Sequence, residues 1–142
     1  MRVMVIVKAS PESEKGQMPS REMLTEMGNF NEELIKAGIM LAGEGLAQSK
    51  DGKRVRFSKD GKQKTVIDGP FTESKELVAG FWIWQVKSME EAVEWLKRAP
   101  FQDGEVEIRR VHEAADFGDS FDPELLKKEE AWREKSGFAE KK

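Results

Sequence analysis

Two kinds of segment alternate along this chain. In one kind the apolar residues have the spacing typical of strands, and in the other they have the spacing typical of helices. Residues 2–8 are apolar at nearly every position, which predicts a strand covered on both faces. The polar residues 9–18 predict a loop, and residues 20–37 predict a helix that Ser20 caps and Gly38 terminates. The apolar stripe of this helix consists of Met23, Met27, Phe30 and Leu34, widened by Leu24 and Ile35.

The next segments predict a short strand and a basic hairpin. Residues 39–46 favour a strand ending in a Gly-Glu-Gly turn, where Glu44 either lies at the rim of a cleft or is an exposed turn residue. Alternating segments on both sides of Asp60-Gly61 predict a β-hairpin. The hairpin carries Lys53, Arg54, Arg56, Lys59, Lys62 and Lys64. Because Phe57 is its only interleaved aromatic residue, we interpret it as a charged edge rather than a nucleic-acid surface.

The most apolar strand, residues 78–86, carries a prediction about assembly. One face of this strand presents Val78, Gly80, Trp82, Trp84 and Val86, and the other presents Ala79, Phe81 and Ile83. Both faces are apolar, and the chain has too few predicted helices to cover both. Large exposed apolar faces are rare on monomers. The pattern therefore predicts a homodimer that buries either the Trp82/Trp84 face or its opposite.

The remaining pattern predicts one more helix, one more strand and an extension. A helix begins at Ser88, with Glu91 completing a capping box, and ends at Pro100. Its buried stripe consists of Ala92, Val93, Trp95 and Leu96, and residues 105–112 form the last strand. After residue 115 the composition changes, and Asp122-Pro123 begins a charged helix. Its only anchors are Leu125, Leu126 and Trp132.

This change of composition predicts two parts of unequal size. Residues 1–115 form the folded domain, and residues 116–142 form a helical extension that docks on the domain or on a partner and frays from residue 136. A chain of 142 residues is long enough for one domain with a single core.

Composition narrows the classes of function. The net charge of -3 argues against a general nucleic-acid binder. With no cysteine and one histidine, the chain offers neither a thiolate nor a multi-histidine metal site, and no cofactor is expected. The apolar run before Lys8 is too short for a signal peptide or a membrane span, which predicts a cytoplasmic protein without membrane contact.

A polar turn leads into the apolar strand and carries a family resemblance. The turn reads Asp68-Gly69-Pro70-Phe71, and Lys75-Glu76 follows before the strand. This motif, with the segment 41–46 and the closing strand 106–109, resembles the YCII-related family in its DGPF-motif branch over about residues 1–115. The resemblance implies an α+β, ferredoxin-like antiparallel sheet with two helices on one face and an inserted hairpin. It also implies a dimeric α+β barrel.

Ionisable groups near this turn are the candidates for chemistry. Glu44 and Asp68 are the candidate catalytic carboxylates, in a cleft roofed by the loop of residues 9–19 and floored by aromatic side chains. The candidate ligand pocket consists of Arg54, Phe71, Lys75 and Trp82. Asp68 has a structural alternative, because a carboxylate before Gly-Pro accepts backbone N–H bonds in an Asx-turn. Lys75 is interpreted as part of a solvated charge cluster with its acidic neighbours.

Histidine is the side chain most often used for proton transfer at neutral pH, but the place of His112 at the end of the last strand favours a structural role. Other branches of the YCII-related family have a histidine near the start of the first helix and an aspartate after the following strand, proposed as an acid–base dyad. The corresponding segments here, residues 18–22 and 47–50, contain neither residue.

Two hypotheses about function follow. The first, slightly favoured by the missing dyad, is a small dimeric module that binds a ligand or regulates a partner. The resemblance implies an association with transcription machinery through sigma-factor partners. The alternative is a cofactor-free acid–base enzyme, an isomerase or lyase, that acts on a small organic acid. A purely structural dimer is a more distant third.

Overall fold

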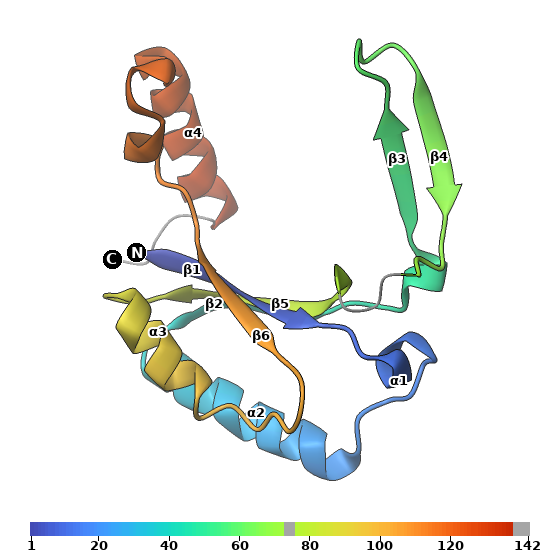
Figure 1. The fold of residues 1–142 in the computed structure, drawn as a ribbon. Helices are drawn as coiled ribbons and strands as arrows, with labels where there is room; N and C mark the ends of the chain where they lie inside the picture. Colours follow the sequence, from blue (N-terminus) through green and yellow to red (C-terminus); the bar gives the residue numbers. More distant parts are fainter. Residues whose placement is uncertain (73–75, 138–142) are drawn as a thin grey trace.

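Four strands form one antiparallel sheet in a computed structural model that describes residues 1–72 and 76–137. The strand order is β2-β5-β1-β6. The strands are β1 (Arg2–Lys8), β2 (Met40–Gly45), β5 (Val78–Gln85) and β6 (Val106–Arg110). Helices α2 (Arg21–Lys36) and α3 (Met89–Leu96) both lie on one face of the sheet (Figure 1). This order of strands and helices is the ferredoxin-like α+β arrangement, so the predicted ferredoxin-like fold is confirmed, and the dimeric barrel stays a prediction.

The core lies between this sheet face and α2. Val3 and Val5 of β1 and Trp84 of β5 are fully buried, and Leu34 of α2 packs with them. Trp82 is also buried, at 5% exposure. The Trp82/Trp84 face is therefore covered by the chain's own helices and is not available to a second copy.

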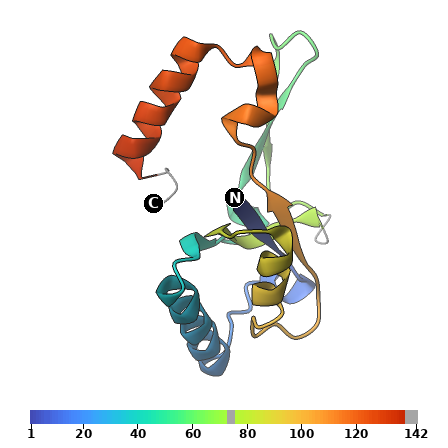
Figure 2. The same cartoon turned by 90° about the vertical axis from the view of Figure 1, so that its left-hand side faces the viewer.

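The other face of the sheet is also apolar, and neither α2 nor α3 covers it (Figures 1 and 2). Antiparallel pairing places Met4 opposite Ile83 and Ile6 opposite Phe81, so these four side chains share this face. We call it the open face. Of the two faces that the sequence offers for a dimer interface, the open face is the one left.

Helix α2 begins and ends where the sequence predicts. The Ser20 side chain accepts a hydrogen bond from the Met23 N–H at 3.1 Å, and Gly38 after the helix has a φ of 73°. The predicted widening of its stripe is wrong, because Leu24 and Ile35 are 57% and 60% exposed. The predicted loop before α2 contains the short helix α1 (Pro11–Glu14).

Helix α3 follows its prediction with two differences. The Ser88 side chain accepts from the Glu91 N–H at 3.1 Å, as expected for an N-cap. The Glu91 carboxylate accepts a 2.6 Å hydrogen bond from the Lys87 N–H. The predicted capping box would instead use the N–H of Ser88. Ala92 is fully buried, whereas Val93 of the predicted stripe is 39% exposed.

The basic hairpin is a separate two-stranded sheet of β3 (Lys53–Phe57) and β4 (Lys64–Asp68). Gly61 in its turn has a φ of 73°, the conformation that the Asp-Gly prediction requires. The hairpin stands away from the four-stranded sheet, on the side of the open face (Figures 1 and 2).

The C-terminal extension also projects on the side of the open face (Figures 1 and 2). It contains a 3₁₀ segment, η3 (Ala114–Ser120), and helix α4 (Pro123–Ser136). Asp122 caps α4 as predicted, accepting from the Glu124 N–H at 2.9 Å. Leu125 and Trp132 do not anchor α4 on the domain, because they are 45% and 57% exposed, and docking on a partner stays a prediction. The predicted fraying falls largely on residues 138–142, which lie outside the described residues.

No helix in the described part of the chain is both long and apolar enough to cross a membrane.

Candidate functional site

A cavity of about 340 Å³ opens between α2 and one end of the sheet. Its walls come from both layers of the fold and are mostly apolar or aromatic. The lining residues are Val7, Pro19, Met27, Asn31, Gly43, Glu44, Gly45, Ala79, Gly80, Phe81, Trp82 and Phe101. Pro19 belongs to the segment that the sequence predicts as a roof, and the aromatic side chains belong to the predicted floor.

Glycines on β2 and β5 allow the sheet to come close to the cavity wall. A Cβ at Gly43 would lie 2.7 Å from Cδ1 of Trp82, so a side chain there would displace the indole. A Cβ at Gly80 would lie 2.9 Å from the Glu44 carbonyl oxygen on the neighbouring strand. The position of the Trp82 indole therefore depends on glycine at residue 43, and the close approach of β2 to β5 depends on glycine at residue 80.

Trp82 is fixed on several sides. Its Nε1–H donates a 2.9 Å hydrogen bond to Oδ1 of Asn31. Its ring makes edge contacts with Phe30 and Phe101, both with ring centroids 6.0 Å apart. Because the Asn31 oxygen is engaged by the indole, the two N–H groups on Nδ2 are the polar groups that Asn31 offers to the cavity. The cavity thus has rigid apolar walls and one oriented amide.

Glu44 lines this cavity, as the cleft-rim interpretation expects. It pairs with Phe81 across the strands, so its side chain lies on the open face rather than on the face of Trp82. The residue lines the cavity and is exposed.

Asp68 lies elsewhere, at the end of β4. Its carboxylate accepts from the Lys53 ammonium at 2.5 Å and is 75% exposed. Asp68 is not among the residues that line the cavity with Glu44. The structure therefore does not bring the two candidate carboxylates together there, and their catalytic roles stay a prediction.

The Asp-Gly-Pro-Phe motif forms a joint between the hairpin and the rest of the domain. A Cβ at Gly69 would lie 1.8 Å from the Ser49 carbonyl oxygen, so only glycine fits. The Gly69 N–H donates to the Gly52 carbonyl at 3.0 Å, and the Phe71 N–H donates to Ser49 Oγ at 3.0 Å. Ser49 Oγ in turn donates to the Glu14 carboxylate at 2.5 Å. The motif thereby joins the hairpin to α1 and to η1 (Ser49–Asp51).

The other predicted pocket residues divide between two places. The Arg54 guanidinium lies 3.8 Å above the centre of the Phe71 ring, a cation–π contact beside the joint. Phe71 lines a separate cavity of about 420 Å³ together with Glu14, Ser49 and Val78. Trp82 lines the first cavity, and Lys75 lies outside the described residues. The described residues that were predicted to form one pocket therefore lie at two separate places.

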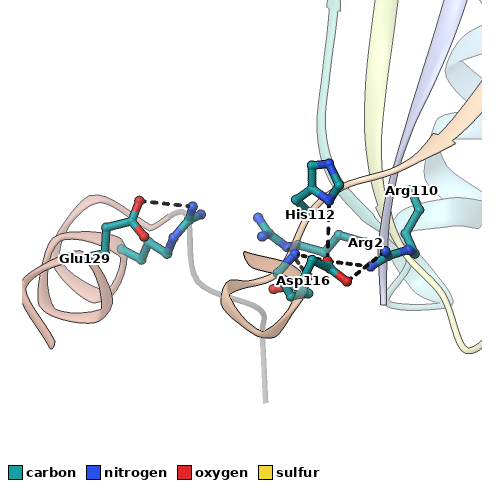
Figure 3. A network of polar contacts seen from close by, with 7 residues as sticks. Arg2, Arg110, His112, Asp116 and Glu129 are labelled. Carbon is teal, nitrogen blue, oxygen red and sulfur yellow. Dashed lines mark hydrogen bonds and ion pairs between the residues drawn. The ribbon is translucent and has the colours of Figure 1, made fainter. Parts of the chain in front are cut away.

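His112 belongs to a polar network at the base of the C-terminal extension (Figure 3). Its Nδ1 lies 3.6 Å from Asp116, and its ring packs against Phe117 with centroids 5.3 Å apart. Arg110 donates two hydrogen bonds to Asp116, at 2.8 and 2.9 Å. This guanidinium, with the Glu113 N–H, holds the pKa of Asp116 well below its usual value. The geometry suits the structural interpretation of His112, because the network fixes η3 against β6.

Sequence analysis missed Asn31 and Asp116. Asn31 follows Met27 by four residues and thus lies on the apolar stripe of α2, which is the signal that would have identified it. Asp116 lies four residues after His112, but nothing in the pattern shows that Arg110 pairs with it. Among residues 1–72 and 76–137, no three histidine, aspartate or glutamate side chains gather in a geometry suited to a metal ion.

Comparison with solved structures gives a distant likeness. The 5-chloro-2-hydroxyhydroquinone dehydrochlorinase of Burkholderia phenoliruptrix AC1100, in complex with 2,5-dihydroxybenzoquinone, aligns with 18% sequence identity and a TM-score of 0.45. The alignment covers 82% of this chain and 98% of the dehydrochlorinase. No curated protein matches the chain by sequence.

Comparison with protein families gives a direct match. The model of the YCII-related domain matches residues 1–115. The match does not test the DGPF-motif branch, which stays a prediction. Since it covers most of the chain, the chain belongs to the family of proteins with a YCII-related domain.

Proposed function

We propose that this protein is a dimeric binding module for a small, uncharged, largely aromatic ligand. The observation that carries the proposal is the lining of the cavity between α2 and the sheet. Its volume of about 340 Å³ lies at the lower end of the range for ligand pockets, about 300–1,000 Å³. Trp82 and Phe101, whose rings lie against each other, supply flat apolar surface.

The charge of the lining selects among ligands. The residues that line the cavity include no lysine, arginine or histidine. An organic acid would leave its water shell without gaining a cation, which is costly in an apolar pocket. A neutral ring with a carbonyl or ether oxygen meets no such cost, because Nδ2 of Asn31 donates to that oxygen.

The acid–base alternative needs two cooperating groups near the cavity. Glu44 turns its side chain to the open face, and Asp68 is paired with Lys53 on the hairpin. Neither arrangement gives a base directed at a molecule beside Trp82. Binding without chemistry is therefore the function that we propose.

A ligand panel observed by NMR tests this proposal. Acetophenone, benzoate and benzylamine share a ring of one size and differ in charge. We expect acetophenone to shift the indole N–H signal of Trp82 and the side-chain amide signals of Asn31, and benzoate to shift them least. The four tryptophan indoles are assigned by comparison with Trp82→Phe.

Asn31→Asp is the variant that isolates the amide. It keeps an oxygen to accept from the Trp82 indole and removes the Nδ2 donors. We expect acetophenone to bind at least about tenfold more weakly, which is the loss of about 1.4 kcal/mol expected for a ligand oxygen without a donor. Asn29→Asp, exposed on the same helix, adds the same charge and should change nothing. Absence of any shift at millimolar ligand, or equal effects of the two variants, would contradict the proposal.

The dimeric part of the proposal rests on the open face. Met4, Ile6, Phe81 and Ile83 form an apolar surface that neither α2 nor α3 covers. A second copy packed face to face would bury it, as the resemblance to dimeric α+β barrels implies. The sigma-factor partner implied by the same resemblance stays a prediction.

A further inference from the structure

The hairpin β3–β4 is the most exposed regular structure in the described part of the chain. Every residue of β3 and all but Ile67 of β4 are exposed. Its two strands are bonded only to each other, and a two-stranded hairpin is at best marginally stable alone in water. In the described part of the chain no other strand pairs with it, so its surface is free to meet a partner.

One face of the hairpin is apolar. Cross-strand pairing places Val55 opposite Val66 and Phe57 opposite Lys64, so these side chains share a face. Val55 is 49% exposed, and Phe57 and Val66 are each 61% exposed. Arg54 lies on the other face, where it packs over Phe71. The surface to be covered is thus an apolar patch with lysines at its edge.

The hairpin is also strongly basic. Residues 53–68 contain six lysines and arginines and two aspartates, a net charge of +4. Lys53 is paired with Asp68. Lys59, Lys62 and Lys64 near the turn make no ion pair with the described residues. A matching surface would combine apolar side chains with carboxylates.

The start of the C-terminal extension has this complementary character. Residues 116–124 contain Asp116, Asp119, Asp122 and Glu124 and no lysine or arginine, a net charge of -4. Asp116 is engaged by Arg110 and Asp122 caps α4, whereas Asp119 and Glu124 make no ion pair within residues 1–72 and 76–137. Phe117 and Leu125 beside them are 48% and 45% exposed.

The two surfaces stand apart in one chain but on the same side of the sheet. The hairpin and the extension rise at opposite ends of the open face, away from α2 and α3 (Figures 1 and 2). When two copies meet at their open faces, a two-fold axis can run between the sheets, across the line that joins the two arms. Rotation about that axis exchanges the two ends, so the hairpin of each copy meets the extension of the other. The contact then forms twice, as two-fold symmetry requires.

We propose that the apolar, basic face of the β3–β4 hairpin docks on residues 116–125 of a second copy of this chain. This inference rests on the homodimer proposed above and adds a second, reciprocal interface to it. Val55, Phe57 and Val66 pack against Phe117 and Leu125. The hairpin lysines pair with Asp119 and Glu124.

Cross-linking tests the proposal directly, because the chain has no cysteine of its own. Gln63→Cys places a thiol on the hairpin and Ser120→Cys places one on the extension, both at exposed, uncharged positions. The two full-length variants are mixed and treated with a short thiol-to-thiol cross-linker. We expect several-fold more linked two-chain product in the mixture than with either variant alone. Asn29→Cys, exposed on α2, replaces either partner as the control and should give only background.

The outcomes separate this proposal from the homodimer. Sedimentation of the same samples shows whether a dimer is present. A dimer without cross-linking above the Asn29→Cys background overturns the docking alone. A monomer overturns the homodimer and the docking with it.

Charge reversal provides a second, independent test. Replacing Lys59, Lys62 and Lys64 with glutamate should raise the dimer dissociation constant at least about tenfold. Adding Asp119→Lys and Glu124→Lys to the same chain should restore most of the affinity. An unchanged dissociation constant, together with lysine-dependent binding of a fluorescein-labelled DNA duplex, would instead assign the hairpin to nucleic acid and overturn the proposal.

Discussion

The domain and its two projecting arms are built in opposite ways. In the domain, strands far apart in sequence pair, and Val3, Val5 and Trp84 are completely buried under α2. The hairpin and α4 are held by local contacts, and their large apolar side chains Phe57 and Trp132 are about 60% exposed. The buried core therefore lies in the domain, and the arms expose the apolar surface that we propose a second copy covers.

This difference shows how the role of an apolar side chain depends on whether another element of the chain packs over it. The same residue type is structural where a helix lies over it and available for association where none does. Each of the following predictions compares matched substitutions in the two regions, and the expected effects decrease from one to the next.

Tryptophan-to-alanine substitutions should show the largest difference in stability between the domain and its arms. Trp84→Ala removes a fully buried indole and should lower the free energy of unfolding by about 3–5 kcal/mol. Trp132→Ala removes an indole that is 57% exposed on α4 and should change it by less than about 1 kcal/mol. Urea denaturation measures both. Similar losses for the two variants would show that α4 is packed as firmly as the domain.

Two glycine substitutions compare the joint of the hairpin with an open helix surface. Gly69→Ala forces the backbone of residue 69 or Ser49 to move and should destabilise the protein by about 2–3 kcal/mol. Gly28→Ala on α2 meets no atom within 4 Å and should stabilise the helix by about 0.5–1 kcal/mol. Thermal unfolding, with hydrogen exchange of the hairpin amides, measures the effects. A neutral Gly69→Ala would show that the motif does not fasten the hairpin.

Removal of residues 116–142 tests whether the domain folds without its extension. The core residues all precede the cut, so the shortened chain should unfold cooperatively and lose less than about 3 kcal/mol. The comparison should be made at one low protein concentration, because association adds to the apparent stability. Loss of a cooperative transition would show that the extension is part of the core.

Acid should weaken the contact between the extension and β6 only at low pH. The pKa of Asp116 in the folded protein lies below its value in the unfolded chain, chiefly because Arg110 donates to the carboxylate. Its stabilising contribution is therefore fully present above about pH 4 and is lost as the pH falls toward the lowered pKa. Carboxyl NMR titration should find Asp116 titrating below the usual range of an aspartate. Arg110→Met should move Asp116 upward, and an unchanged titration in that variant would contradict the assigned cause.

The fold was predictable because its strands and helices differ in period. Alternation on β5 and helical spacing on α2 indicate most of the core, and the capping residues indicate the helix ends. The ferredoxin-like arrangement is what the family resemblance implies. Leu24 and Ile35 lie outside the buried stripe of α2, because helical spacing alone does not show how far the sheet extends beside the helix. Trp132 does not anchor α4 on the domain, because hydrophobicity alone does not show whether anything lies opposite a side chain.

The candidate site was less predictable, since it depends on contacts between distant segments. Glu44 was placed at a cleft from its flanking glycines, and it does line the cavity. Asp68 was paired with it because both follow strands, but the hairpin carries Asp68 away toward Lys53. Asn31 acquires its role only through Trp82, a residue 51 positions further along the chain.

The most direct test of the claim that a second copy completes this molecule is its mass in solution. Sedimentation equilibrium at micromolar concentration should show a dimer for the unmodified chain. Ile83→Glu, on the open face, should shift it to a monomer that keeps its circular dichroism spectrum, whereas Ile35→Glu, exposed on α2, should leave the dimer unchanged. A monomeric unmodified chain, or a dimer that Ile83→Glu does not weaken, would contradict the claim.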